Sequence, residues 1–123
     1  MNFQKICILG LGYIGLPTAS TFATHGLKVV GVDINRQIIE TLQHGNIHIH
    51  EAGLRTAVES ALSSGNLTVS LQPEEADAFL IAVPTPFFED RHGEYQGRQY
   101  RLADMRAVIS ATEAIVPHLR KAI

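Results

Sequence analysis

The chain has 123 residues, of which 46% are hydrophobic, enough for one folded domain with an apolar core. Ten basic and twelve acidic residues give a formal charge of −2, and without a basic stripe the composition argues against a nucleic-acid partner. No apolar run approaches the roughly 18 residues that span a membrane, the N-terminus lacks a signal-peptide pattern, and the single cysteine allows no intrachain disulfide, so we expect a cytoplasmic protein without membrane partners.

The pattern of apolar residues predicts strands that alternate with helices. We expect strands at residues 5–10, 28–33, 67–70 and 77–83. Helices are expected at residues 14–25, from a cap at Asn35 to about Gly45, at residues 54–64, and from a cap at Asp104 to about Ala122. This alternation is typical of a parallel sheet with right-handed crossovers. The predicted fold class is therefore α/β: a Rossmann-like doubly wound parallel sheet, truncated to about four strands in the order 3-2-1-4.

One segment departs from this pattern. Residues 88–106 are rich in charged residues and contain two glycines and two tyrosines, so we expect a long surface loop, most mobile at residues 88–103. A doubly wound sheet normally has about six strands, and only four are expected here. The sequence therefore suggests the front part of a larger enzyme, with an uncovered apolar surface near the last helix.

Three glycines follow the first expected strand. Gly10, Gly12 and Gly15 form the pattern G-x-G-x-x-G, with a strand before it, a helix after it and Asp33 at the end of the next strand. In a dinucleotide site the first glycine permits the sharp turn, the second leaves room for a pyrophosphate, and the third lets the helix pack closely. The amides of residues 11–14 would then face the phosphates at a helix N-terminus. The alternative is a plain tight turn in an α/β domain.

Asp33 bears on the identity of the dinucleotide. A carboxylate at this place can accept hydrogen bonds from both ribose hydroxyls of the adenosine. It would repel the 2′-phosphate of NADP, so NAD is the expected cofactor, although Arg36 is near enough to keep NADP open. Proteins that bind FAD share the glycine pattern but usually carry glutamate here, which leaves FAD as a minor alternative.

A resemblance to a known family is carried by the stretches "GLGYIGLPTA", "VDIN", "GNIHIHEAGL" and "ADAFLIAVPTPF". They resemble the UDP-glucose/GDP-mannose dehydrogenase family, and within it the subfamily that oxidises UDP-N-acetyl-D-mannosamine. The resemblance implies oxidation of a sugar C6 alcohol to a carboxylate with two NAD, through a catalytic cysteine in the family's later domains. It also implies that residues 1–123 are an incomplete N-terminal NAD-binding domain without the central and C-terminal substrate domains. The full-length protein is then expected to be a homodimer that binds a nucleotide sugar.

The resemblance also assigns residues to the cofactor. Together with the glycine pattern, it gives these candidate cofactor-binding residues: Gly10, Leu11, Gly12, Tyr13, Ile14, Gly15, Asp33, Val83, Pro84 and Thr85. The chain departs from the family at Ile38, where several relatives have a basic residue, and at Ala52, where relatives have proline. We expect no catalytic residue in this chain, because Cys7 lies in the middle of a strand and should behave as a small hydrophobe. A non-catalytic NAD-binding module is the alternative function.

The stretch after the second expected helix contains other polar candidates. His48, His50 and Glu51 could suggest a metal, but no zinc motif accompanies them, so no metal site is expected. We expect a solvated connection in which the alternating pattern buries Ile47 and Ile49. Glu51 is expected to be the N-cap or a first-turn acid of the helix at residues 54–64.

Overall fold

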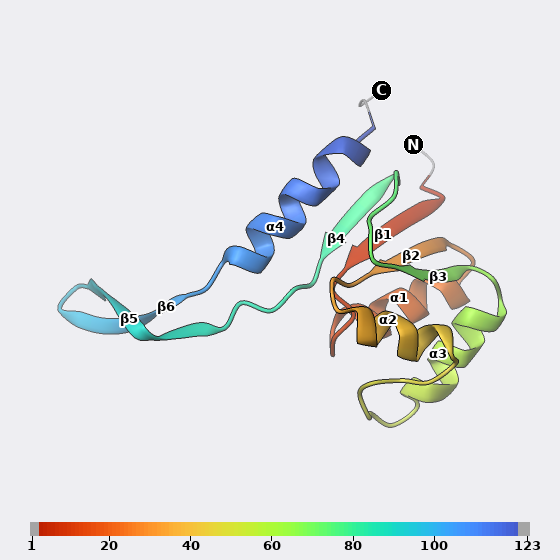
Figure 1. The fold of residues 1–123 in the computed structure, drawn as a ribbon, viewed down its shortest axis with the longest axis horizontal. Helices are drawn as coiled ribbons and strands as arrows, with labels where there is room; N and C mark the ends of the chain where they lie inside the picture. Colours follow the sequence, from red (N-terminus) through yellow and green to blue (C-terminus); the bar gives the residue numbers. More distant parts are fainter. Residues whose placement is uncertain (1–2, 121–123) are drawn as a thin grey trace.

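A computed structural model describes residues 3–120, and its centre is a four-stranded parallel sheet (Figure 1). The strands are β1 (Lys5–Leu9), β2 (Lys28–Val32), β3 (Leu67–Ser70) and β4 (Ala78–Ile81), in the order β3-β2-β1-β4. This order confirms the predicted topology, with β1 in the interior of the sheet. Strands β1, β2 and β4 end one or two residues earlier than expected.

The early ends of these strands have a common cause. Leu9 pairs with Val32 on one side and with Ile81 on the other, so three strands end at the same level. At the next position Gly10 adopts a φ of +98°, which turns the chain out of the sheet. The carboxyl ends of β1, β2 and β4 therefore form one rim.

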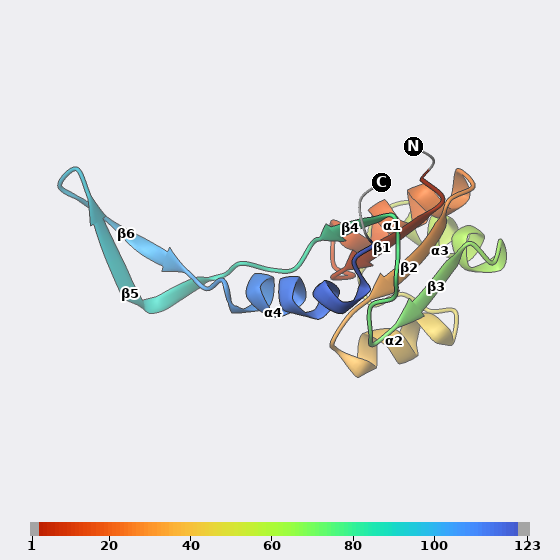
Figure 2. The same cartoon turned by 90° about the horizontal axis from the view of Figure 1, so that it is seen from above.

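Helices cover both faces of the sheet, as expected for a doubly wound fold. Figures 1 and 2 show α1 (Gly15–Thr24), α2 (Arg36–Gln43) and α3 (Leu54–Ser63) on one side and α4 (Arg106–Ile115) on the other. Side chains of β1 alternate between the two layers, with Ile6 and Ile8 packing toward α1 and α3 and Cys7 and Leu9 packing toward α4. Alternation of this kind is what a strand covered on both faces requires.

The last helix is shorter than predicted. A 3₁₀ turn, η1 (Val116–His118), follows α4, and Leu119 is extended. Pro117 explains the change, because proline has no N–H to donate and its ring clashes with the carbonyl four residues earlier in an α-helix. Residues 121 and 122 of the predicted helix lie outside the described residues.

Apolar side chains are exposed around α4 and the neighbouring edge strand β4. They include Leu80, Ile81, Ile109, Val116 and Leu119. This agrees with the expectation of uncovered apolar surface near the last helix.

The predicted surface loop is wrong, because most of it forms a β-hairpin. Strands β5 (Phe87–Tyr95) and β6 (Arg98–Ala103) pair antiparallel and extend away from the parallel sheet (Figures 1 and 2). The two-residue turn has a positive φ at both Gln96 and Gly97, the conformation that matches the twist of a hairpin. Gly93 pairs with Tyr100 across the hairpin, and the ring of Tyr100 fills the space that a side chain at Gly93 would occupy.

The base of the hairpin is fastened to α4 by Asp104. Its amide donates to the Pro86 carbonyl at 2.7 Å, and its Oδ1 accepts from the Arg106 amide at 3.1 Å and from the Arg106 Nε at 2.9 Å. The Arg106 guanidinium also lies 5.5 Å from the centre of the Phe88 ring. Met105 occupies the N-cap position that was predicted for Asp104, although Asp104 still binds the first amide of the helix.

A second carboxylate, that of Asp77, lies at the end of the sheet where β1 and β4 begin. Asp77 Oδ2 accepts from the amides of Gln4 and Lys5 at 2.9 and 3.0 Å, and Oδ1 lies 2.6 Å from Arg120 Nη1. The amides of Gln4 and Lys5, and then the Arg120 guanidinium, hold the pKa of the Asp77 carboxyl below its ordinary value. Asp77 thus connects the starts of β1 and β4 to the segment after η1.

We predict that Asp77→Asn lowers the melting temperature at neutral pH. Its carboxylate has a lower pKa when folded, so its stabilising effect is present above the ordinary carboxyl pKa and is lost as the pH falls through the folded-state value. Melting curves of the wild type and the variant should therefore converge in acid. Arg120→Gln is the control and should cost less, because it removes the half-exposed ion pairs with Asp77 and Glu75 and leaves the two amide bonds to Asp77. Equal melting temperatures for Asp77→Asn and wild type at pH 7 would contradict this role.

We predict that Arg106→Gln raises the pKa of Asp104. The side-chain hydrogen bond from Arg106, followed by its amide, lowers the pKa of the Asp104 carboxyl to about 2. An NMR titration of the carboxyl carbon measures this value directly. In Arg106→Gln the pKa should move toward the ordinary range, whereas Arg91→Gln, which removes a weaker charge effect, should change it less. An Asp104 pKa that is the same in wild type and Arg106→Gln would show that the pair does not form.

Candidate dinucleotide-binding site

The glycine loop, residues 10–14, connects β1 to α1 at the rim of the sheet. A Cβ on Gly10 would lie 2.7 Å from the carbonyl carbon of Ala82 and 3.0 Å from the Val83 amide nitrogen. A Cβ on Gly15 would lie 2.8 Å from the carbonyl carbon of Gly10. Both glycines are therefore required by the packing of the protein itself.

Gly12 differs from the other two glycines. A Cβ built on it would meet no atom within 4 Å, and its φ is not in the left-handed region. A tight turn explains Gly10 and Gly15, but it gives no reason for a glycine at this position. Open space beside a backbone amide is what the close approach of a pyrophosphate requires.

The start of α1 presents free hydrogen-bond donors at the same place. The N-cap residue, Ile14, makes no side-chain cap, and within residues 3–120 the amides of residues 12–15 donate to no protein acceptor. Tyr13 and Ile14 have exposed side chains. An uncapped helix of ten residues with several free amides carries partial positive charge, which favours an anion.

Asp33 lies beside this loop, just past the end of β2. Its Oδ2 accepts from the Leu11 amide at 3.0 Å, and its Oδ1 accepts from the Asn35 amide at 2.9 Å. Asn35 in turn caps α2 as predicted, because its side chain accepts from the Gln37 amide at 3.0 Å. The carboxylate is thus fixed in position, and its remaining lone pairs can still accept from hydroxyl groups.

The end of β4 completes the rim. The Ala82 amide donates to the Leu9 carbonyl at 2.7 Å, so the following residue, Val83, lies close to Gly10. Val83 is half-buried, whereas Pro84 and Thr85 are exposed on the way to the hairpin. The chain after β1 crosses to one face of the sheet and the chain after β4 leads to the other, which makes this rim a topological switch point, the usual ligand site of such folds.

His48 was missed as a site residue. Its Nε2 lies 2.6 Å from the Leu11 carbonyl oxygen, and its Nδ1 is buried without a partner among the described residues. The neighbouring Ile47 and Ile49 are buried as predicted, but the expected solvated connection is wrong at His48. Sequence reasoning had one available signal, a polar side chain between two buried isoleucines, and no means of finding its partner 37 positions away.

The other polar residues of this connection are not brought together. His50 and Glu51 are exposed, and within residues 3–120 no three metal-binding side chains form a cluster. The predicted capping role of Glu51 is wrong. The N-cap of α3 is Gly53, with a φ of +78°, and the helix has no acidic residue in its first turn.

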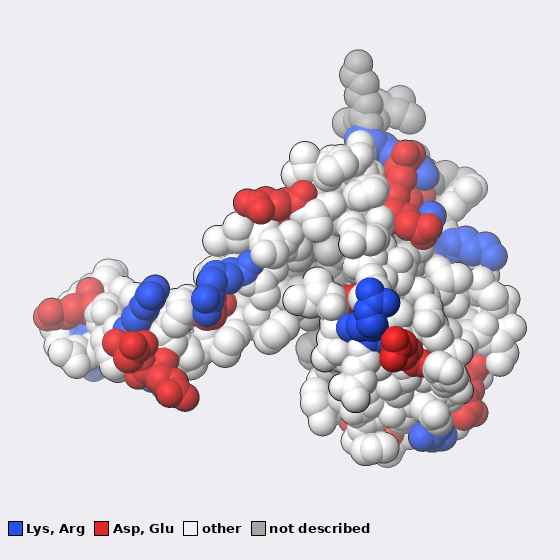
Figure 3. Space-filling model, in the orientation of Figure 1, with Lys and Arg blue, Asp and Glu red and all other residues white. Residues whose placement is uncertain are grey.

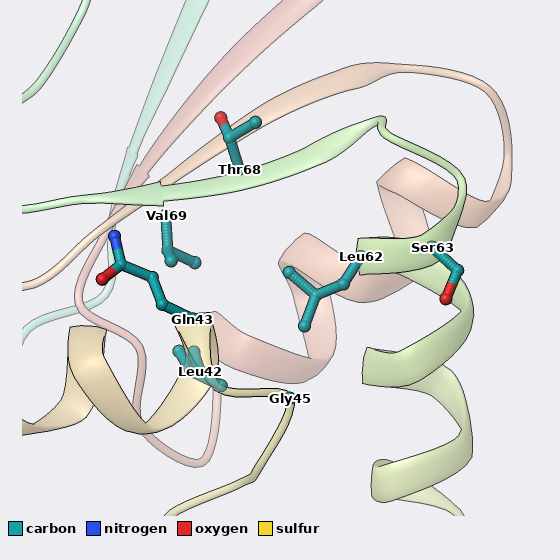
Figure 4. A pocket seen from close by; sticks show the side chains of 7 residues that line it. All are labelled: Leu42, Gln43, Gly45, Leu62, Ser63, Thr68 and Val69. Carbon is teal, nitrogen blue, oxygen red and sulfur yellow. The ribbon is translucent and has the colours of Figure 1, made fainter.

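A separate hollow of about 490 Å³ lies between α2, α3 and β3 (Figure 4). Leu42, Leu62 and Val69 point toward one another there, and the remaining lining residues are Gln43, Gly45, Ser63 and Thr68. None of these side chains is charged, and the hollow contains none of the candidate cofactor-binding residues. On the molecular face in Figure 3, basic side chains are scattered among acidic ones. No helix in the described part of the chain has the length and apolarity to cross a membrane.

Several known proteins resemble this chain in sequence and fold. Residues 4–123 match the model of the "UDP-glucose/GDP-mannose dehydrogenase family, NAD binding domain". A UDP-N-acetyl-D-mannosamine dehydrogenase of Methanococcus maripaludis is 47% identical over 119 residues, which are 97% of this chain and 26% of that protein. The native structure of the UDP-N-acetyl-mannosamine dehydrogenase Cap5O from Staphylococcus aureus matches with 49% identity and a TM-score of 0.86, over 96% of this chain and 27% of that one.

A UDP-glucose dehydrogenase from the hyperthermophilic archaeon Pyrobaculum islandicum also matches, with 38% identity and a TM-score of 0.76, over 93% of this chain and 25% of that one. The chain thus spans about a quarter of the length of these relatives. The family model covers nearly the whole chain, including the glycine loop, Asp33 and the end of β4. This chain therefore belongs to the UDP-glucose/GDP-mannose dehydrogenase family and is its NAD-binding domain.

Proposed function

We propose that NAD binds at the rim formed by β1, β2 and β4, as part of an enzyme that oxidises UDP-N-acetyl-D-mannosamine to its uronic acid. The observation that carries the binding site is Gly12, which neither backbone conformation nor packing requires to be glycine. The open space at Gly12 lies beside the free amides of residues 12–15, so shape and charge agree on an anion at this point.

The candidate residues fall into groups with different roles in cofactor binding. The amides around Gly12, Tyr13 and Ile14 hold the pyrophosphate, and the Asp33 carboxylate accepts from the hydroxyls of the adenosine ribose. Gly10, Leu11 and Gly15 shape the loop. Val83 and Pro84 line the groove through their backbone, and Thr85 lies near the cofactor. Bound NAD supplies the hydride acceptor for the oxidation.

The substrate assignment rests on the named relatives. Relatives at 47% and 49% identity bear the name UDP-N-acetyl-mannosamine dehydrogenase, whereas the UDP-glucose dehydrogenase is 38% identical. We propose that residues 1–123 are the N-terminal NAD-binding part of a longer cytoplasmic, homodimeric enzyme whose other domains bind the nucleotide sugar. The only thiol, Cys7, is buried, and this burial raises its pKa. The chain alone is therefore expected to bind NAD without turnover.

We predict that Asp33→Ala weakens NAD binding tenfold or more. Hydrogen bonds to a charged group are each worth about 1.5–3 kcal/mol, and about 1.4 kcal/mol corresponds to a tenfold change in Kd. Titration calorimetry with NAD and NADP should also show a smaller preference for NAD in the variant, because the 2′-phosphate no longer meets a carboxylate. Asp90→Ala, on the hairpin, is the control and should bind NAD as the wild type does. Equal NAD affinity in wild type and Asp33→Ala would disprove this placement of the ribose.

We predict that Gly12→Val abolishes NAD binding with little loss of stability, because its side chain would enter the space of the pyrophosphate and its Cβ would have no protein atom within 4 Å. Gly15→Val is the matched control. Its side chain would collide with the Gly10 carbonyl, so it should lower the melting temperature strongly. Calorimetric titration and melting curves separate the two effects. If Gly12→Val destabilises the fold as much as Gly15→Val, the glycine serves only a tight turn.

A further inference from the structure

We propose that His48 is a positioning residue that locks the Leu11–Gly12 peptide in the orientation that turns the Gly12 amide toward the diphosphate of the cofactor. This inference deepens the proposed function and rests on it, because it concerns the same rim. A contact of His48 joins the connection between α2 and α3 to the glycine loop.

The contact defines the state of the imidazole. Nε2 lies 2.6 Å from the Leu11 carbonyl oxygen, and a carbonyl oxygen only accepts, so Nε2 carries the hydrogen. Nδ1 is buried and has no partner among residues 3–120, so no second hydrogen bond within that range directs the ring. Ile47 and Ile49 are buried on either side and hold the backbone of His48 against the loop. Within the described residues, the imidazole therefore makes one hydrogen bond, which it donates to the Leu11 carbonyl.

The geometry of a peptide unit carries this effect to the next residue. In a trans peptide the C=O and the following N–H lie in one plane and point in opposite directions, and no described peptide is cis. Because the Leu11 carbonyl points to His48, the Gly12 N–H points away from His48. That amide donates to no acceptor within the described residues. His48 thus orients a donor that it does not touch.

Leu11 is held on its other sides as well. Its amide donates to Asp33 Oδ2 at 3.0 Å, and its side chain is fully buried in the core beneath α2 and α3. Gly31 makes room for this side chain, since a Cβ there would lie 3.0 Å from Leu11 Cδ2. The carbonyl is the remaining point of freedom, because a glycine at position 12 offers little steric resistance to rotation of the peptide plane. The bond from His48 removes this freedom before the ligand arrives, which reduces the ordering cost of binding.

The test compares ADP with adenosine as ligands of the ¹⁵N-labelled chain. Both carry the ribose that Asp33 would bind, and only ADP carries the diphosphate. We expect His48→Leu to weaken ADP about tenfold, as loss of one well-placed hydrogen bond to an anion would, and to leave adenosine nearly unchanged. His48→Gln, which retains an N–H donor on a side chain of similar reach, should restore most of the ADP affinity. His50→Leu alters an exposed histidine two positions away and should have no effect.

Two spectra of the wild type accompany the titrations. The imidazole ¹⁵N shifts should show hydrogen on Nε2 and none on Nδ1 of His48, and the Gly12 amide should shift on adding ADP. Adenosine should not produce that shift. These spectra test the proposal even if His48→Leu unfolds.

The outcomes separate the inference from the function on which it rests. If wild type and His48→Leu bind ADP equally, or if the variant loses ADP and adenosine in equal measure, the positioning role is overturned and the proposed function remains. Hydrogen on Nδ1 with none on Nε2 also overturns it. If the wild type binds neither NAD nor ADP, the proposed function is overturned, and this inference with it.

Discussion

The close approach of β1 and β4 at Gly10 is the contact on which the rest of this structure depends. A single side-chain carbon at Gly10 would lie 2.7 Å from the Ala82 carbonyl carbon, so any other residue would push the two strands apart where they end. The same glycine turns the chain out of the sheet into the glycine loop. Its carbonyl packs directly against Gly15 at the start of α1. The spacing of the strand ends, the exit of the loop and the approach of α1 therefore all depend on this one backbone contact, and so does the shape of the rim.

The strand order and the glycine loop could be predicted because their signals are local. An apolar run, three spaced glycines and an acidic residue after the next strand lie within 33 residues and follow from backbone sterics. The end of α4 was predicted too late, although Pro117 marks it and the effect of proline on a helix is local. The hairpin was harder, because Gln96 tolerates a positive φ only as part of a turn that pairing of the strands stabilises. Charge and glycine content suggested a loop, whereas the cross-strand contact of Tyr100 with Gly93 depends on register.

In the candidate site too, the residues with local sequence signals could be predicted, and the contact that depends on tertiary packing could not. Gly10, Gly15 and Asp33 can be placed from spacing alone, and the structure brings their backbone and side chains to one rim. The contact of His48 with Leu11 spans 37 residues and depends on how the connection after α2 packs beneath the loop. No periodicity or propensity encodes such a contact, because it results from tertiary packing of two irregular segments.

The burial of Cys7 has a practical consequence. This residue is the chain's only thiol, it lies in the interior strand with no solvent exposure, and both faces of that strand are covered. A thiol reagent can reach it only when α4 leaves the sheet or the sheet itself opens, since Cys7 packs toward α4, and fraying of the hairpin or movement of the glycine loop leaves β1 covered. The rate at which Cys7 is labelled therefore reports opening of the core, either by detachment of α4 or by separation of the strands, without any engineered probe, and it distinguishes damage to the core from changes at the rim.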